Sequence, residues 1–88
     1  MDRRVLIQER LSAAFAPVAL DVEDESAKHR GHAGAAGGAG HFRVRLVSER
    51  FRGRSRLERH RLVYDALAAE LGPEIHALAL ELRSPDEL

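Results

Sequence analysis

Apolar and polar residues alternate along the chain with two different periods, and these periods distinguish helices from strands. Over residues 2–14 the apolar positions recur at helical spacing with charged residues between them, which predicts an amphipathic helix. These positions are Leu6/Ile7, Leu11 and Ala14/Phe15. Pro17 ends the helix, because proline lacks an amide donor and disfavours helical backbone at the residue before it.

Three later segments have the two-residue period of strands. Residues 18–23 predict a half-buried strand, residues 41–48 a second strand, and residues 75–82 a third whose apolar character, apart from His76, is typical of a buried strand. The apolar faces of the first two strands carry Val18, Leu20 and Val22, and then Phe42, Val44 and Leu46. Residues 24–40 form a long loop rich in glycine, alanine and histidine, which we expect to be mobile because it has little to bury.

A second helix is predicted between the last two strands. Ser55 and Glu58 have the spacing of a capping box, with Ser55 as the N-cap. The helix is expected to run to about Leu71, where Gly72-Pro73 ends it. Its predicted core positions are Leu57, Val63, Tyr64, Leu67 and Leu71. Residues 84–87 begin a further helical turn, with proline at the first position.

The order helix–strand–strand–helix–strand, followed by a helical turn, favours an α+β fold: a three-stranded sheet with helices packed on one face. The 88 residues form a single domain, 1–88, since nothing in the pattern separates them. With 14 basic and 14 acidic residues the net charge is zero, so global charge favours no class of partner.

Composition also bears on chemistry and location. The chain has no cysteine, and it shows no Ser-His-Asp spacing and no phosphate-binding glycine motif, so we expect no enzyme activity. The charged start of the chain does not resemble a signal peptide, and no apolar run reaches the roughly 18 residues of a membrane span. We therefore expect a cytoplasmic protein that does not enter membranes, monomeric or weakly dimeric through an exposed strand edge.

Histidines and arginines are the candidate functional residues. His29 and His32 lie in the glycine-rich loop, where their spacing could hold copper or zinc weakly, and His76 opens the third strand. His41 is a further candidate ligand, whereas His60 is expected to be partly buried and structural. A basic segment before and within the second helix is a candidate for nucleic-acid binding through Arg50, Arg52, Arg54, Arg56 and Arg59, or simply a solvated surface.

Four short motifs follow one another along the chain: Asp24-Glu25-Ser26, His41-Phe42-Arg43-Val44, Arg59-His60-Arg61 and His76-Ala77-Leu78-Ala79-Leu80. In these motifs the chain resembles the BolA family, in its bacterial type, from about residue 4 to residue 84. The resemblance implies an α+β fold related to the class II KH domain. It also implies a monothiol glutaredoxin as partner, with a 2Fe–2S cluster shared between the two proteins and glutathione, and no cluster in the isolated protein.

The resemblance assigns the ligand roles to His76 and to His29 in the loop, and it implies a structural role for His41. His32 is a second candidate ligand in the loop. Alanine and glycine residues lengthen this loop relative to the family pattern. Histidine ligation of a 2Fe–2S centre has a precedent in Rieske sites. Some bacterial members regulate transcription by binding DNA, which makes DNA the alternative partner. A docking surface for glutaredoxin could use the same arginines. The family's role in iron–sulfur trafficking or iron homeostasis is the function that the resemblance implies.

Overall fold

The computed structural model describes residues 2–26 and 40–88, and the candidate ligands His29 and His32 lie outside these residues. The helices are α1 (Arg3–Phe15) and α2 (Arg56–Ala66), and the strands are β1 (Ala19–Asp24), β2 (Gly40–Val47) and β3 (Ile75–Arg83). The 3-10 helices Glu49–Phe51 and Pro85–Glu87 follow β2 and β3. This order confirms the predicted one. Neither helix in the described residues is long and apolar enough to cross a membrane.

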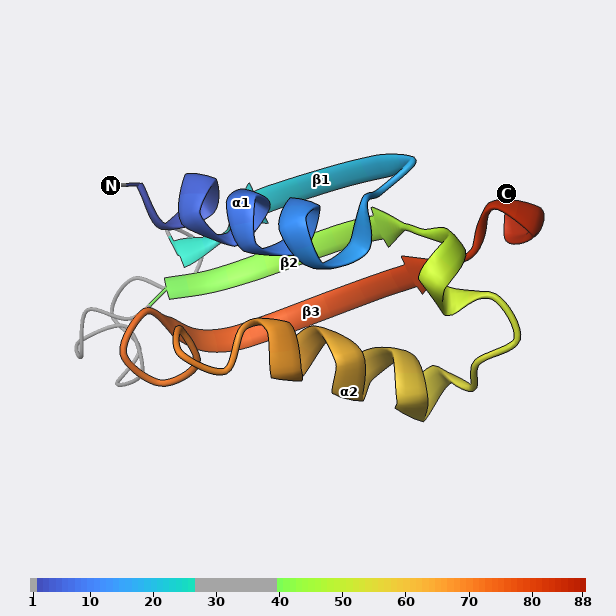
Figure 1. Cartoon of the computed structure of the whole chain (residues 1–88). Helices are drawn as coiled ribbons and strands as arrows, with labels where there is room; N and C mark the ends of the chain where they lie inside the picture. Colours follow the sequence, from blue (N-terminus) through green and yellow to red (C-terminus); the bar gives the residue numbers. More distant parts are fainter. Residues whose placement is uncertain (1, 27–39) are drawn as a thin grey trace.

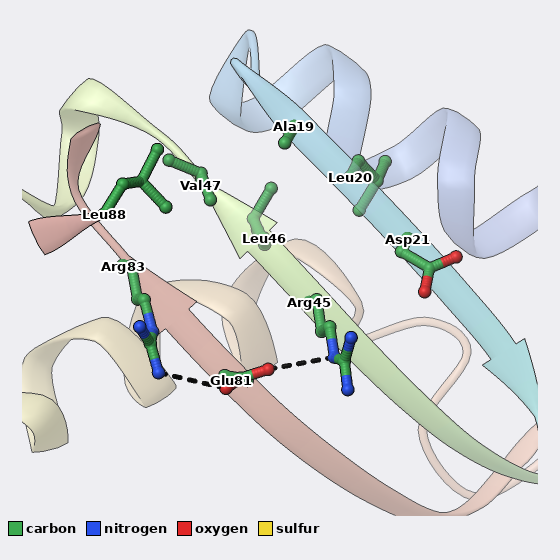
Figure 2. A pocket seen from close by; sticks show the side chains of 9 residues that line it. All are labelled: Ala19, Leu20, Asp21, Arg45, Leu46, Val47, Glu81, Arg83 and Leu88. Carbon is green, nitrogen blue, oxygen red and sulfur yellow. Dashed lines mark hydrogen bonds and ion pairs between the residues drawn. The ribbon is translucent and has the colours of Figure 1, made fainter.

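The sheet has the strand order β1-β2-β3, so β2 is the central strand. β1 is antiparallel to β2, and β3 is parallel to it. Both helices lie on one face of the sheet (Figure 1), which confirms the predicted α+β layer arrangement. In the part of the chain that the structure describes, no helix covers the opposite face, which is the face seen in Figure 2.

The core fills the space between the two helices and the inner face of the sheet. Phe42, Val44 and Leu46 of β2 are buried, as their alternation predicts. The rest of the cluster comes mainly from the helices and the turn after β2, and includes Ile7, Leu11, Phe15, Phe51, Val63 and Leu67. Phe51 was not expected in the core. It lies between arginines in the sequence, yet its ring packs 5.1 Å from the ring of Phe15, centroid to centroid.

α2 begins at the predicted capping box. The Glu58 N–H donates to Ser55 Oγ at 3.1 Å, and the Ser55 N–H donates to the Glu58 carboxylate at 2.8 Å. The prediction that the helix reaches Leu71 is wrong, because it ends at Ala66. A tighter turn follows, in which the Glu70 N–H donates to the Leu67 carbonyl at 2.9 Å and directs the chain back toward β3.

Of the five core positions predicted for α2, two are correct, two are wrong, and Leu71 is partly buried against the core. Val63 and Leu67 are fully buried, whereas Leu57 is 59% exposed and Tyr64 is 41% exposed. Leu57 and Tyr64 lie about a quarter of a turn away from the line through Val63 and Leu67, at 3.6 residues per turn. The helix therefore meets the sheet along a narrower stripe than the apolar pattern suggests. His60 is partly buried, as predicted.

Two strand predictions also need correction. Val18 is not part of the half-buried face of β1, because it precedes the strand and is 63% exposed. The third strand is not a buried strand: it is an edge strand in which only Ile75 is buried and alternate positions are half-buried or exposed. β3 pairs with one strand only, and the helices cover only one of its two faces. The other face of this apolar strand therefore stays exposed.

Arg59 joins α2 to the C-terminal 3-10 helix. Its guanidinium donates to both carboxylate oxygens of Glu87, at 2.6 and 3.2 Å, and to the Leu82 carbonyl of β3 at 3.2 Å. The guanidinium also lies 6.0 Å from the centre of the Phe51 ring. The Arg59 side chain is only 12% exposed, so this contact is structural and holds the end of the chain against the body of the domain.

Replacement of Phe51 tests the unexpected core position. Phe51→Ala is expected to lower the free energy of unfolding by about 3–5 kcal/mol, because it leaves a cavity where a fully buried ring packed. Leu57→Ala is the matched control, and is expected to change stability by less than about 0.5 kcal/mol since its side chain is exposed. Urea unfolding of the two variants measures both values, and equal losses would contradict this assignment of the core.

Acid unfolding tests the contact between Arg59 and Glu87. The hydrogen bonds from Arg59 lower the pKa of Glu87 from 4.5 to about 2. A carboxylate whose folded pKa lies below its unfolded pKa stabilises the fold above about pH 4.5, and this contribution is lost as the pH falls toward 2. Glu87→Gln is therefore expected to flatten the pH dependence of stability between pH 4.5 and 2. The control Glu9→Gln replaces an exposed carboxylate on α1 and should retain the wild-type slope.

Candidate functional site

His76 lies at a slip in the pairing of β3 with β2. Gly40 pairs with Ile75, but the next residue of β2, His41, pairs with Ala77. His76 is therefore the extra residue of a β-bulge, and its side chain is exposed. Bulges redirect side chains relative to the regular alternation of a strand. The predicted ligand thus lies at the end of the sheet, on a feature that turns its side chain outward.

The bulge reverses the alternation of β3. Ile75 is 2% exposed and belongs to the core, His76 and Ala77 are both exposed, and Leu78 is again half-buried. In a regular strand Ile75 and Leu78 would lie on opposite faces. The extra residue allows both apolar side chains to face the helices and leaves His76 outside the core.

Glycine is required on the β2 side of this bulge. Gly40 is buried, and a Cβ atom on it would lie 2.5 and 2.8 Å from two carbons of the Phe42 ring. The Gly40 N–H also donates to the Glu74 carbonyl at 3.0 Å, which joins β2 to the turn before β3. The absence of a side chain at residue 40 therefore leaves room for the Phe42 ring of the same strand, at the point where His76 is displaced.

The structure places His41 beside His76. The two ring centroids are 5.1 Å apart and the ring planes are tilted by 51°. The main chain of His41 is fixed as well: its N–H donates to Ser26 Oγ at 3.1 Å, and its carbonyl accepts from the Glu25 N–H at 2.7 Å. The last described residue before segment 27–39 is therefore bonded to the residue that packs against His76.

The motif Asp24-Glu25-Ser26 forms the other side of this junction. The Ser26 N–H donates to Asp24 Oδ1 at 2.9 Å, and hydrogen bonding from Ser26 lowers the pKa of the Asp24 carboxyl. Glu25 forms an ion pair with Arg43 at 3.3 Å. A shallow cleft of about 250 Å³ lies here on the open face of the sheet, lined by Glu25, His41, Phe42 and residues 77–79. The short side chains of Ala77 and Ala79 line this cleft beside His41.

The described residues do not make up a complete metal site. Among residues 2–26 and 40–88 no three histidine, aspartate or glutamate side chains are grouped closely enough to hold a metal ion. What this part of the chain offers is one exposed imidazole, His76, with a second imidazole packed against it. His41 was only a subsidiary candidate in the sequence. The signal for its place is the apolar spacing of β3, where residues 75, 78, 80 and 82 slip out of the two-residue period.

The candidate nucleic-acid-binding arginines differ in whether a carboxylate of this chain already binds them. Arg59 is held by Glu87 as described above, and Arg52 binds Glu49 at 2.8 Å and Asp86 at 3.2 Å. Arg54 lies 3.8 Å from the Glu58 carboxylate. Arg50 and Arg56 are exposed, and neither forms an ion pair with any described residue. Of these five arginines, Arg50 and Arg56 are therefore the two whose exposed charge no carboxylate of the described residues neutralises.

A larger hollow, of about 460 Å³, occupies the opposite end of the open face of the sheet. Figure 2 shows its charged wall: Arg45 and Arg83 reach toward Glu81 from two sides, at 3.0 and 3.1 Å. Asp21 lies across from Arg45 on β1. The charges of this hollow thus largely neutralise one another, and the geometry favours no particular ligand there.

Comparison with known proteins gives a consistent result. A family model described as BolA-like protein matches residues 11–87. The chain is 52% identical over 77 residues to the "DNA-binding transcriptional regulator BolA" of Escherichia coli (strain K12), a match that covers 88% of this chain and 70% of that protein. It is 44% identical over 91 residues to "SufE-like protein 1, chloroplastic/mitochondrial" of Arabidopsis thaliana, covering 98% of this chain but only 24% of that protein.

A solved structure shows the same fold. The structure titled "BolA domain of SufE1 from Arabidopsis thaliana" superposes with a TM-score of 0.88 at 41% sequence identity, and the match covers 100% of this chain and 98% of that one. The chain therefore corresponds to about a quarter of the length of SufE-like protein 1 and to nearly all of its BolA domain.

Proposed function

The chain belongs to the BolA family, and on that basis we propose that it is a non-enzymatic cytoplasmic protein that binds a monothiol glutaredoxin and shares a 2Fe–2S cluster with it. Histidines of this chain hold their side of the cluster, and glutaredoxin and glutathione supply thiolates. The role of the pair is iron–sulfur trafficking or iron homeostasis. The observation that carries the proposal is the exposed His76 side chain, set at a bulge at the end of the sheet.

The donor set of the described residues fits a shared cluster better than a complete metal site. Neutral imidazole is a good ligand for iron, and the described residues provide His76 without the further ligands that would close a site. The chain has no cysteine, so any thiolate must come from elsewhere. A bound 2Fe–2S cluster would supply one-electron and iron-transfer chemistry, while this chain contributes an oriented imidazole and a docking surface.

His29 and His32 are the proposed sources of a second ligand, and both lie outside the described residues. His29 follows Ser26 by three residues, a span of at most about 10 Å of extended chain, and His32 follows it by six residues, at most about 20 Å. Ser26 is itself bonded to His41, which packs against His76. The shorter connection to Ser26 favours His29 as the second ligand, and His32 is the alternative.

Anaerobic reconstitution tests the cluster. The wild type, a monothiol glutaredoxin and glutathione are combined with iron and sulfide, and visible absorption and circular dichroism are recorded. His76→Ala is expected to remove the features that distinguish the mixed complex from the glutaredoxin homodimer. His60→Ala is the matched control, because it removes a histidine of α2 whose Nδ1 lies 2.8 Å from the Arg56 carbonyl, and should leave the spectrum unchanged.

The loop ligand is identified in the same experiment. Of His29→Ala and His32→Ala, the variant that alters the spectrum of the mixed complex names the second ligand. If the wild type and His76→Ala give identical spectra, the cluster role of this chain is wrong.

DNA binding is a second candidate function. The E. coli relative is named a DNA-binding transcriptional regulator, and the exposed Arg50 and Arg56 flank the start of α2. Arg52 and Arg54 lie between them in the sequence and add to the basic segment, although carboxylates partly neutralise both. Arg59 contributes little to DNA binding because its guanidinium is bound to Glu87.

Salt dependence tests DNA binding. Each cation that neutralises a phosphate releases counterions, so the slope of log K against log[salt] should fall by about one for Arg50→Gln and again for Arg56→Gln. Arg4→Gln removes an exposed positive charge from α1 and serves as the control, with an unchanged slope. A flat salt response of the wild type, or no binding at low salt, would rule out this second function.

A further inference from the structure

The main chain of His41 is held by its neighbours, and its ring lies beside the bulge. Its N–H donates to Ser26 Oγ, its carbonyl accepts from the Glu25 N–H, and in the ladder it pairs with Ala77. Its ring nitrogen Nε2 is buried. Two contacts from the stretch after β1 and one from β3 therefore fix the main chain of His41, and its ring is half-buried at this place.

His76, in contrast, gains little restraint from its own strand. It is exposed, and as the bulged residue it has no cross-strand neighbour on β2. The following residues on the open face, Ala77 and Ala79, are too short to restrain an imidazole. Among the described residues, the ring that packs against it is that of His41, at 5.1 Å between centroids with a tilt of 51°. This distance lies within the range of favourable aromatic pairs.

We infer that His41 is a positioning residue for His76: its fixed ring selects the side-chain rotamer of His76 and so sets the direction of the coordinating nitrogen. The inference rests on the proposed function, since it assigns a task to His41 within the same site. Residues that contact a ligand without binding the metal orient that ligand and tune its affinity. His41 acts through packing, while His76 does the binding.

The contact is built into the strand pairing. Ala77 is opposite His41, and the bulge displaces the preceding residue, His76, next to it. Gly40, next to His41, leaves room for the buried Phe42 ring, because a Cβ at residue 40 would strike that ring. Any substitution that keeps a flat ring at position 41 should therefore preserve the orientation of His76, and one that removes the ring should lose it.

The first test uses the isolated protein, without iron. Nuclear magnetic resonance measures the three-bond couplings that report the χ1 rotamer of His76, together with the contacts between the two histidine rings. The wild type is expected to show one dominant rotamer. His41→Ala should show averaged couplings, and His41→Phe, which retains a ring, should restore the single rotamer. Averaged couplings in the wild type, or a single rotamer in His41→Ala, would overturn the inference.

The second test uses the complex with monothiol glutaredoxin and glutathione. His41→Ala is expected to change the visible circular dichroism of the cluster and to release iron to a chelator about tenfold faster than the wild type. His41→Phe should resemble the wild type in both measurements, and His60→Ala is the control. If His41→Ala does not fold, His41→Leu replaces it, because leucine retains bulk without a flat ring.

The outcomes separate this inference from the function on which it rests. If His76→Ala leaves the spectrum unchanged, the proposed function fails. If His76→Ala changes the spectrum while His41→Ala matches the wild type, the function stands and the positioning role is wrong. If His41→Phe loses the cluster as completely as His76→Ala does, a nitrogen of His41 is needed, and positioning by the ring alone is again wrong.

Discussion

The pairing of β2 on both of its sides is the constraint on which the rest of this structure depends. β2 provides the inner face of the core, and its two registers fix where β1 and β3 lie. Just after its C-terminal end the buried Ser48 donates through Oγ to the Phe15 carbonyl at 2.7 Å, and through its N–H to the Arg83 carbonyl at 3.0 Å. That end is bonded to the end of α1 and to the end of β3. The N-terminal end of β2 is different, because its pairing with β3 slips there and exposes His76.

Much of the fold could be predicted because β2 obeys a simple rule. A strand with one face on the core and one face in water shows regular alternation, and Phe42, Val44 and Leu46 show it clearly. The end of α2 could not be found in this way, because helix-forming residues continue past Ala66 while the geometry of the return to β3 requires a turn. Local propensity is a weak preference that tertiary contacts override.

The candidate site was only partly visible in the sequence for a related reason. His76 can be singled out as a polar residue in an apolar run, but its neighbour His41 lies 35 positions earlier, and only the register of two strands brings them together. The arginines illustrate the same limit. Arg56 and Arg59 are three residues apart on one helix, yet one is exposed and the other is bound to Glu87 near the end of the chain. Charge is evident from sequence, whereas the partner of a charge is a property of the fold.

A ligand that must meet a partner protein faces two opposing requirements. It has to be exposed, since a buried imidazole is out of reach, but an exposed side chain has rotational freedom that binding must remove, at about 0.5–1.5 kcal/mol for each side chain immobilised. A domain of 88 residues has little interior in which to build a preformed site. The bulge resolves this conflict: it moves His76 out of the core while the strand beside it presents the ring of His41. On the proposed function, part of the ordering of His76 is then completed when the chain folds, by the same strand pairing that forms the core.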